Sequence, residues 1–412
     1  MYFILTLLCF YPLYSDTSIL NKSTQRYESL DTFAQVLRLL ESAYVDEDSV
    51  KDNKIIDKVI KNMASDLDPH TRVLSPSELK ELNQDTSGKF GGIGVSITLE
   101  KKKIEVIDVM PNSPAEKAHL LPGDILTKID ELLITADNLE LAMNHLRGKP
   151  GSTLQIEWLR NKVIMKATLR REVIEVANTY DAELSSGFFY IKLNSFQEDS
   201  PEKIHQILLK QEKKGLKGLI LDLRDNPGGL LNSAVKISNL FVNSGIIVST
   251  VGRDPQKQEV EYAIQNYAHP YMHLIVLVNG GSASASEIVA GALQDHKRAL
   301  IAGSTTFGKG SVQSVFPLSN GGGLKVTIGR YFTPKGRSIQ AKGITPDLYL
   351  DNQSNLKQSF LKESDLKGHI EAKDYIEQKD EKVFLSWPKK LQEDQQLMVA
   401  YHFMKSWIGM KK

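Results

Sequence analysis

The sequence predicts a multidomain α/β protein with an N-terminal helical segment, a small sheet-rich domain, an α/β core built on a mixed sheet, and a C-terminal helical tail. Twice in the second half, over 218–242 and 274–293, an apolar β-branched run leads through a glycine turn into apolar residues at helical spacing. Repeated strand, turn and helix predict neighbouring strands that present their turns at one edge of a sheet. Alternating apolar residues over 93–99 and helical spacing over 30–63 predict the earlier domains.

The composition is that of an ordinary globular protein. The chain has 412 residues, 41% hydrophobic and 25% charged, which is enough for two or three domains. A formal net charge of +1 gives no electrostatic argument for a nucleic-acid partner or an anionic membrane surface. Cys9 is the only cysteine, and the nine histidines show no close metal-ligand spacing. No metal and no other cofactor is therefore expected.

The first 15 residues are apolar, too few to span a bilayer as a helix, and followed by polar sequence. They are expected to be a secretory signal peptide, with an uncleaved anchor as the alternative. Cleavage near Ser15 would remove Cys9 and leave a cysteine-free chain, which suits an oxidising compartment. We therefore expect an exported protein, periplasmic or membrane-associated on the outer side of the cytoplasmic membrane.

Residues 16–86 are predicted to be mainly helical. Apolar residues recur at helical spacing over 30–40 and over 55–63, with a polar break at 46–49. Two amphipathic helices follow, each with a face that packs on a core or on a second copy. His70, in the segment after them, is interpreted as structural.

A sheet-rich domain is predicted over 87–171, with strands over 90–99 and 104–110 and helices over 113–118 and 138–146. These features resemble a PDZ domain, a β-barrel-like fold. Such a domain binds a peptide as an added strand and holds its terminal carboxylate on N–H groups of a glycine-containing loop. The alternative is that the glycines only shape a turn. The expected peptide-binding residues are Gly91, Gly92, Ile93, Gly94 and Val95 of the loop, with Leu139 and Met143 at the pocket for the last side chain.

The core is predicted over 172–350, and its candidate nucleophile is Ser284. An apolar strand over 274–278 breaks at Asn279-Gly-Gly, and a helix follows from about Ala285. A hydroxyl on such a turn lies at the mouth of the sheet, beside a helix N-terminus that favours developing negative charge. The alternative is a capping box, in which Ser284 and Glu287 satisfy each other's backbone donors.

Lys309 is the candidate general base. It lies between two glycines, where a close backbone approach is expected, and burial would favour its neutral form. Gln313 would orient the amine through a hydrogen bond. The alternatives are a solvated loop lysine and a nucleotide site, since 303–310 is one residue short of the phosphate-binding loop motif. The missing hydroxyl and the strand-like alternation that follows disfavour the nucleotide site.

Backbone donors for an oxyanion are expected at Gly228 or Gly229, which follow the buried strand over 218–223, and at Ala285. Each such donor is typically worth about 3 kcal/mol of transition-state stabilisation. The alternative is a plain Pro-Gly turn.

Three segments together resemble the C-terminal processing peptidases, also called tail-specific proteases, of family S41: Asn279–Glu287, Thr306–Gln313 and Gly336–Asp347. In that family the middle serine of S-A-S-A-S attacks, and the lysine of G-K-G follows 25 positions later, as 309 − 284 gives here. The glutamine of the family triad matches Gln313. The resemblance covers roughly residues 32–350.

This resemblance implies a serine endopeptidase with a PDZ domain that captures protein C-terminal tails and a Ser–Lys dyad that cuts through an acyl-enzyme. It also implies self-association through the N-terminal helices, as a homodimer or higher homo-oligomer, and a PDZ arginine that couples groove occupancy to the active site, for which Arg147 is the candidate. An adaptor or regulator is left open as a further partner. The alternative from another class is a catalytically silent PDZ scaffold, which intact Ser284, Lys309 and Gln313 disfavour. A Ser–His–Asp hydrolase is disfavoured because no G-x-S-x-G surrounds Ser284.

Residues 351–412 are rich in Lys, Glu, Asp and Gln, with apolar residues returning near the end. A solvated linker and a terminal helix are predicted, and no chemistry is expected there.

Overall fold

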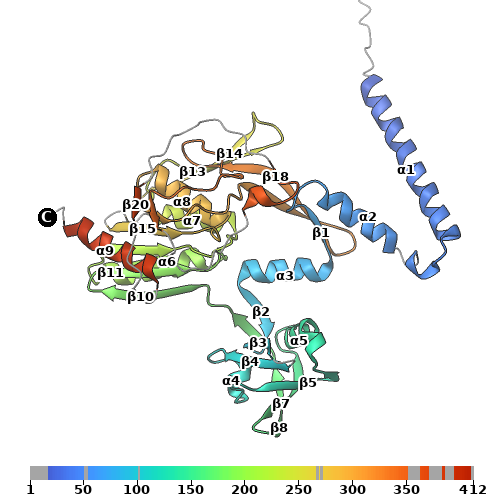
Figure 1. Cartoon of the computed structure of the whole chain (residues 1–412), viewed down its shortest axis with the longest axis horizontal. Coiled ribbons are helices and arrows are strands. Elements are labelled where there is room, and N and C mark those ends of the chain that lie inside the picture. The colour runs from blue at the N-terminus through green and yellow to red at the C-terminus, as the bar shows by residue number, and fades with distance from the viewer. Residues whose placement is uncertain are drawn as a thin grey trace, which may run out of the picture. The chain divides into compact units, whose positions relative to one another are not determined.

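The computed structural model describes residues 17–50, 54–100, 103–265, 269, 272–350, 362–370, 383–385 and 394–409 (Figure 1). The expected signal peptide, residues 1–15, lies outside the described residues, as does much of the expected linker over 351–393. The chain divides into two compact units, Met1–Ala64 and Ser65–Lys412.

The first unit holds α1 (Thr17–Ala43), η1 (Glu47–Ser49) and α2 (Lys54–Ser65), so the two predicted helices are confirmed. Their apolar stripes are exposed on this single chain, including Leu30 and Val36 on α1 and Met63 on α2. Among the described helices, none is both long and apolar enough to cross a membrane.

The second unit opens with β1 (Arg72–Leu74), which was not predicted, and α3 (Pro76–Ser87), which lies in the region expected to be mainly helical although no individual helix was assigned there. Helix α3 has a capping box at Ser75 and Glu78, and it ends at Gly88 in the left-handed conformation, which glycine adopts without a Cβ penalty. The strand β1 pairs with β18 (Gly323–Phe332), so residues far apart in sequence share a sheet.

The predicted PDZ region folds as a six-stranded sheet with its own core, built on residues such as Val106, Ile156 and Trp158. The predicted strand over 90–99 is split, because Gly94 takes a φ of 79° that a strand cannot continue through. The elements of the predicted PDZ region are β2 (Lys89–Gly92), β3 (Val95–Glu100), β4 (Lys103–Val109), α4 (Pro114–Lys117), β5 (Ile125–Ile129), β6 (Leu132–Leu133), η2 (Ala136–Asn138), α5 (Leu139–Leu146), β7 (Thr153–Arg160), β8 (Val163–Arg170) and β9 (Glu172–Glu175). The strand β2 pairs with β9 and lies outside the six-stranded sheet.

The core is a seven-stranded mixed sheet in the order β10-β11-β12-β15-β16-β19-β20. The strands β11, β12, β15 and β16 are parallel, and β10 is antiparallel to β11. The strands are β10 (Thr179–Ser185), β11 (Phe188–Leu193), β12 (Gly218–Asp222), β15 (His273–Val278), β16 (Leu300–Gly303), β19 (Leu348–Leu350) and β20 (Val383–Leu385).

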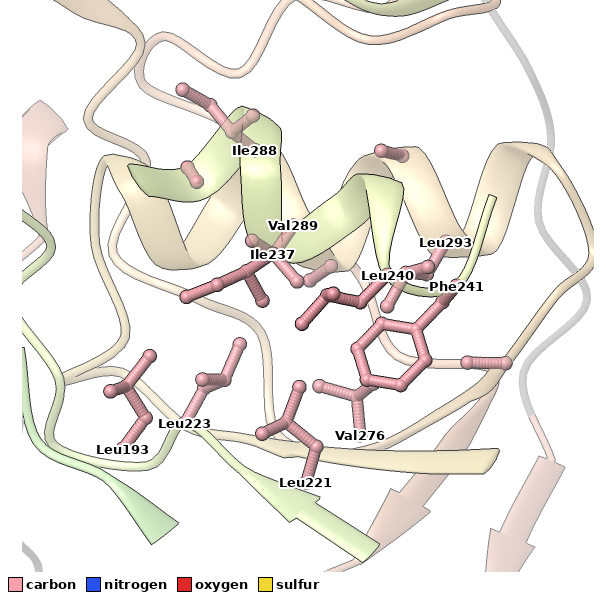
Figure 2. Close-up of a cluster of buried hydrophobic side chains, with 14 of the residues drawn as sticks. Leu193, Leu221, Leu223, Ile237, Leu240, Phe241, Val276, Ile288, Val289 and Leu293 are labelled. Carbon is pink, nitrogen blue, oxygen red and sulfur yellow. The ribbon is translucent and has the colours of Figure 1, made fainter. Parts of the chain in front are cut away.

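Helices cover both faces of this sheet. The helices α6 (Ser200–Glu212), α7 (Leu231–Asn239) and α8 (Ala285–Asp295) share one core cluster with alternate strand residues such as Leu221 and Val276. Figure 2 shows side chains of α7 and α8 next to Leu221 of β12, Val276 of β15 and Leu223, which directly follows β12. The predicted terminal helix, α9 (Gln395–Gly409), packs with Ile220 and Ile275 on the opposite face. Because parallel strands end at the same edge, the turns after β12 and β15 come together there.

A second sheet, in the order β1-β18-β13-β14 with β17 on β18, completes the core. Its other strands are β13 (Ile246–Gly252), β14 (Gln258–Tyr262) and β17 (Ser311–Pro317). The segment after Lys309 is therefore the strand β17 and not a helix, which removes the nucleotide-loop alternative.

Candidate active site

Ser284 lies at the turn between β15 and α8, as predicted. Its backbone has φ 54° and ψ −110°, a region that non-glycine residues rarely adopt. Such strain persists only where surrounding structure enforces it, and it commonly marks a functional turn. Ser284 is half-buried, whereas both of its neighbours, Ala283 and Ala285, are buried.

The three serines of the S-A-S-A-S segment have different roles. Ser282 and Ser286 are 0% exposed, and their hydroxyls donate to the carbonyl oxygens of Leu223 and Asn226 at 2.7 and 2.9 Å. These two bonds tie the turn after β15 to the turn after β12. Of the three serines, only Ser284 is not fully buried.

Glu287 joins the serine turn to the lysine loop. Its carboxylate is fully buried and accepts the N–H of Ser284 at 2.8 Å, the carboxylate half of the predicted capping box. It also accepts the N–H groups of Gly308 and Lys309, at 2.7 and 2.9 Å, and the Thr306 hydroxyl at 2.6 Å. Burial raises the pKa of Glu287 to about 7, although these four donors oppose that rise.

The loop that carries Lys309 is held by close backbone contacts. A Cβ at Gly310 would lie 2.4 Å from the backbone nitrogen of Gln340, so only glycine fits there, as predicted. The N–H of Phe307 donates to Ser282 O at 3.0 Å, which docks the loop against the serine turn. Burial lowers the pKa of Lys309, against the opposing charges of Glu363, Glu287 and Asp68. Lys309 is half-buried, which disfavours the alternative of a fully solvated loop lysine.

The turn after β12 lies directly against Ser284. A Cβ at Gly228 would come within 2.9 Å of Ser284 Cβ and 3.0 Å of Ala285 N. The N–H of Gly228, however, donates to Asn226 Oδ1 at 2.9 Å. The backbone N–H groups of Gly229 and Ala285 donate to no described residue. Of the predicted oxyanion donors, Gly229 and Ala285 are the two with a free N–H.

Arg224 anchors the same turn. Its guanidinium donates to both oxygens of Asp222, at 2.9 and 2.6 Å, and to both oxygens of Asp394, at 2.7 and 2.6 Å. Bidentate pairs of this kind fix geometry as well as contribute energy. Asp394 also accepts the N–H of Leu397 at the start of α9, so the terminal helix braces the turn that contains Gly228.

Gln313 lies on β17 close to this site but does not bond the Lys309 amine. Its side-chain nitrogen donates to Ser311 Oγ at 2.9 Å and to Thr327 Oγ1 at 3.4 Å. Thr327 Oγ1 donates in turn to Asp68 at 3.2 Å. The predicted hydrogen bond from Gln313 to the amine is therefore not present in this structure.

The candidate peptide groove lies between β3 and α5. Of the predicted residues, Gly92, Ile93, Gly94, Val95 and Met143 line it. Gly91 instead meets Gly148, whose oxygen would lie 1.9 Å from an added Cβ, and Leu139 packs against the domain core. The predicted coupling residue Arg147 also lines the groove, with its guanidinium 5.0 Å from the centre of the Phe90 ring.

Known proteins resemble this chain along almost its whole length. The model for peptidase family S41 matches residues 187–350, and the PDZ model matches residues 91–170. A carboxy-terminal-processing protease from Bartonella bacilliformis is 37% identical over 402 residues, covering 94% of this chain and 91% of the relative. The chain belongs to peptidase family S41.

Other members of the family align over shorter spans. A probable CtpA-like serine protease from Staphylococcus aureus is 34% identical over 351 residues, covering 84% of this chain and 70% of the relative. Among solved structures, the photosystem II D1 C-terminal processing protease is 31% identical, with a TM-score of 0.46, and covers 77% of this chain and 92% of its own. The predicted resemblance is confirmed, and the chain is a serine-type peptidase with a PDZ domain.

Sequence reasoning missed several residues of this S41 peptidase. Glu287 was considered only as a cap, although it directly precedes the apolar run 288–293, and a carboxylate beside such a run is a signal of a buried acceptor. Glu363 was placed in a segment without chemistry, yet its charge acts on Lys309. No periodic pattern surrounds Glu363, so the sequence offered no signal for it. Among the described residues, no group of three or more His, Cys, Asp or Glu could hold a metal ion.

Proposed function

We propose that this peptidase is an endopeptidase that recognises protein C-terminal tails through its PDZ domain and cuts with Ser284 and Lys309. The observation that carries the proposal is the shared carboxylate of Glu287, which holds the backbone of both residues. Two of the similar proteins are named as proteases that process carboxy-terminal ends, and these names support the same substrate class.

The first half of the reaction forms an acyl-enzyme. Neutral Lys309 takes the proton of the Ser284 hydroxyl while Oγ attacks the carbonyl carbon of the scissile bond. The negative oxygen of the tetrahedral intermediate is then stabilised by the N–H groups of Gly229 and Ala285, with Gly228 as a further donor if its bond to Asn226 opens. The protonated amine of Lys309 passes its proton to the leaving nitrogen, and the C–N bond breaks.

The second half reverses these roles. Lys309, neutral again, takes a proton from water, whose oxygen attacks the acyl carbon. The new tetrahedral intermediate collapses, Ser284 Oγ leaves and regains its proton from Lys309, and the new C-terminus is released. These steps need no metal or nucleotide.

The PDZ groove supplies the substrate. An extended tail would pair with β3, place its terminal carboxylate at the loop around Ile93 and Gly94, and direct its last side chain towards Met143. We propose apolar C-terminal residues as the preferred class, because the lining offers Ile97, Met143 and Leu146.

The test is cleavage of an unfolded model protein with an apolar tail by wild type, Ser284→Ala and Lys309→Ala, in EDTA. Cleavage by wild type alone, with tail binding retained by both variants, supports the proposal. Tail binding without cleavage by any form supports the silent scaffold instead. Cleavage that survives in both variants rejects the dyad.

We further propose that the protein is exported and self-associates. The apolar residues 1–15 support export, and the exposed apolar stripes of α1 and α2 support a homodimer or higher homo-oligomer. Cell fractionation tests the first, and light scattering of the chain with and without charges introduced at Leu30 and Val36 tests the second. A cytoplasmic pool alone, or a monomer at all concentrations, contradicts them.

A further inference from the structure

Glu363 is a fully buried carboxylate in a segment that follows the residues matched by the family model. It begins the short helical turn η3 (Glu363–Asp365), whereas the match ends at residue 350. Its side chain is 0% exposed. A buried carboxylate is costly unless several donors satisfy it. Its donors are His70 Nε2, at 2.8 and 2.9 Å from the two oxygens, and Gln340 Nε2, at 3.0 Å.

Hydrogen bonds connect Glu363 to the chain both before and after Lys309. The N–H of Glu363 donates to Phe307 O at 3.2 Å, two residues before the lysine. On the other side, Gln340 Oε1 accepts the N–H of Gly310 at 3.0 Å while its Nε2 donates to Glu363. The carboxylate therefore belongs to the lysine loop by geometry, although 54 positions separate the two residues by number (363 − 309).

His70, interpreted as structural from the sequence, is oriented for this contact. Its backbone N–H donates to Asp68 Oδ1 at 2.8 Å. Asp68 also accepts the N–H and hydroxyl of Thr71, at 2.9 and 2.6 Å, which rigidifies the segment before β1. An ionised carboxylate can only accept, so the imidazole Nε2 donates to Glu363. His70 thus acts as a clamp on the acid.

We propose that Glu363, clamped by His70 and Gln340, is a positioning residue of the peptidase that sets the charge state of Lys309 and with it the pH range of catalysis. This inference rests on the proposed Ser284–Lys309 dyad. Glu363 touches no substrate in this role and acts through the lysine. Its carboxylate favours the ammonium form, which opposes the effect of burial and keeps the amine basic enough to take a proton from serine.

The charges around the amine agree with this role. Burial lowers the pKa of Lys309, and Glu363 is the foremost of the three acids that oppose it, ahead of Glu287 and Asp68. A second lysine, Lys325 on β18, is affected by the same charge, because burial first and then the charge of Lys309 lower its pKa to about 8. Burial also raises the pKa of Glu363, but the bonds from His70 and Gln340 outweigh it, so the acid stays ionised.

The experiment is the pH profile of kcat/KM for wild type and Glu363→Gln, which removes the charge and nearly preserves shape. Activity rises with pH as Lys309 loses its proton. Without the carboxylate the pKa of the amine falls, so this rise is expected about 1 pH unit lower. Glu363→Met, which needs no hydrogen-bond partners, provides a second neutral variant if Gln does not fold. Asp365→Asn removes an exposed acid of the same turn and is expected to leave the profile unchanged.

The outcomes separate this inference from the proposed function. A lower acid limb in either neutral Glu363 variant, with the Asp365→Asn limb unmoved, supports the inference. Activity that falls equally at every pH, or a limb that does not move in a folded variant, overturns it and leaves only a structural role. Ser284→Ala is assayed in parallel: if it still cuts, the dyad itself is wrong, and the inference fails with it for that separate reason.

Discussion

Ser284 and Lys309 donate their backbone N–H groups to the same carboxylate oxygen, Oε2 of Glu287, at 2.8 and 2.9 Å. The other oxygen takes the Thr306 hydroxyl and the Gly308 N–H. One buried side chain thereby sets the relation between a helix start and a loop that are 25 positions apart. Disturbing this acid should affect the proposed nucleophile and base together.

Glu287→Gln is expected to lower kcat/KM at least ~10-fold and the free energy of unfolding by about 2 kcal/mol, because an amide NH₂ would face N–H donors. Cleavage kinetics and urea titration measure the two effects. The matched control is Glu78→Gln, since Glu78 accepts the N–H of Ser75 in another capping box. If Glu287→Gln behaves like this control, the shared carboxylate does not organise the site.

Ser284→Ala and Ser286→Ala should have opposite effects. Ser284→Ala removes the proposed nucleophile and is expected to abolish cleavage without lowering the melting temperature. Ser286→Ala removes the donor to the Asn226 carbonyl and should cost about 1 kcal/mol of stability while cleavage persists. Cleavage assays and thermal unfolding of both variants give the comparison. Loss of activity in Ser286→Ala alone would move the nucleophile to another residue.

The pH dependence of stability should reveal the buried amine. The folded pKa of Lys309 is lowered below its usual 10.5, so the unfolded chain binds more protons between the two values. Stability therefore rises with pH across that window, and the full cost of charging the buried amine applies below it. Lys309→Met removes this cost and is expected to stabilise the fold most at low pH, with the difference vanishing near pH 10.5. A constant difference at all pH values, measured by urea titration, would argue against a perturbed lysine.

Arg147→Ala tests coupling between the groove and the dyad. The prediction is that proteolysis of a tailed substrate falls while the affinity for the free tail peptide is kept. Its position over Phe90 makes direct loss of binding the competing outcome. Peptide titration and cleavage kinetics distinguish the two, with exposed Lys149→Ala as the neighbouring control. Equal losses of binding and cleavage would remove Arg147 as a coupling residue.

Local pattern explains which parts of the fold could be predicted. The strands β12 and β15 are apolar runs that are buried on both faces, and each leads into a glycine turn and a helix. The order of strand, turn and helix could therefore be predicted from the sequence. Motif spacing likewise made Ser284 and Lys309 the candidates, and it predicted the close backbone approach that the structure shows at Gly310. The strand β1 was missed, because a three-residue strand has no periodicity and gains its structure from pairing with β18. The helix α3 lies in the region expected to be mainly helical, but no individual helix was assigned there.

The polar contacts could not be predicted in the same way. Asp68, His70, Gln340 and Glu363 come from separate segments, and only the fold brings them to the lysine loop. The amide of Gln313 donates to Ser311 and Thr327, and the N–H of Gly228 to Asn226, because nearer partners compete for these donors. Spacing fixes which residues approach a site, whereas tertiary competition decides which hydrogen bonds form.

The most direct measurement of the central claim is covalent labelling of the active-site serine. Wild type and Lys309→Ala would be treated with a fluorophosphonate probe across a pH series, and the labelled serine would be identified by peptide mass spectrometry. We predict labelling of Ser284 in wild type that increases as Lys309 loses its proton, and loss of this labelling in Lys309→Ala. Labelling of Ser284 that is equally fast without Lys309, or labelling of a different serine, would contradict the dyad.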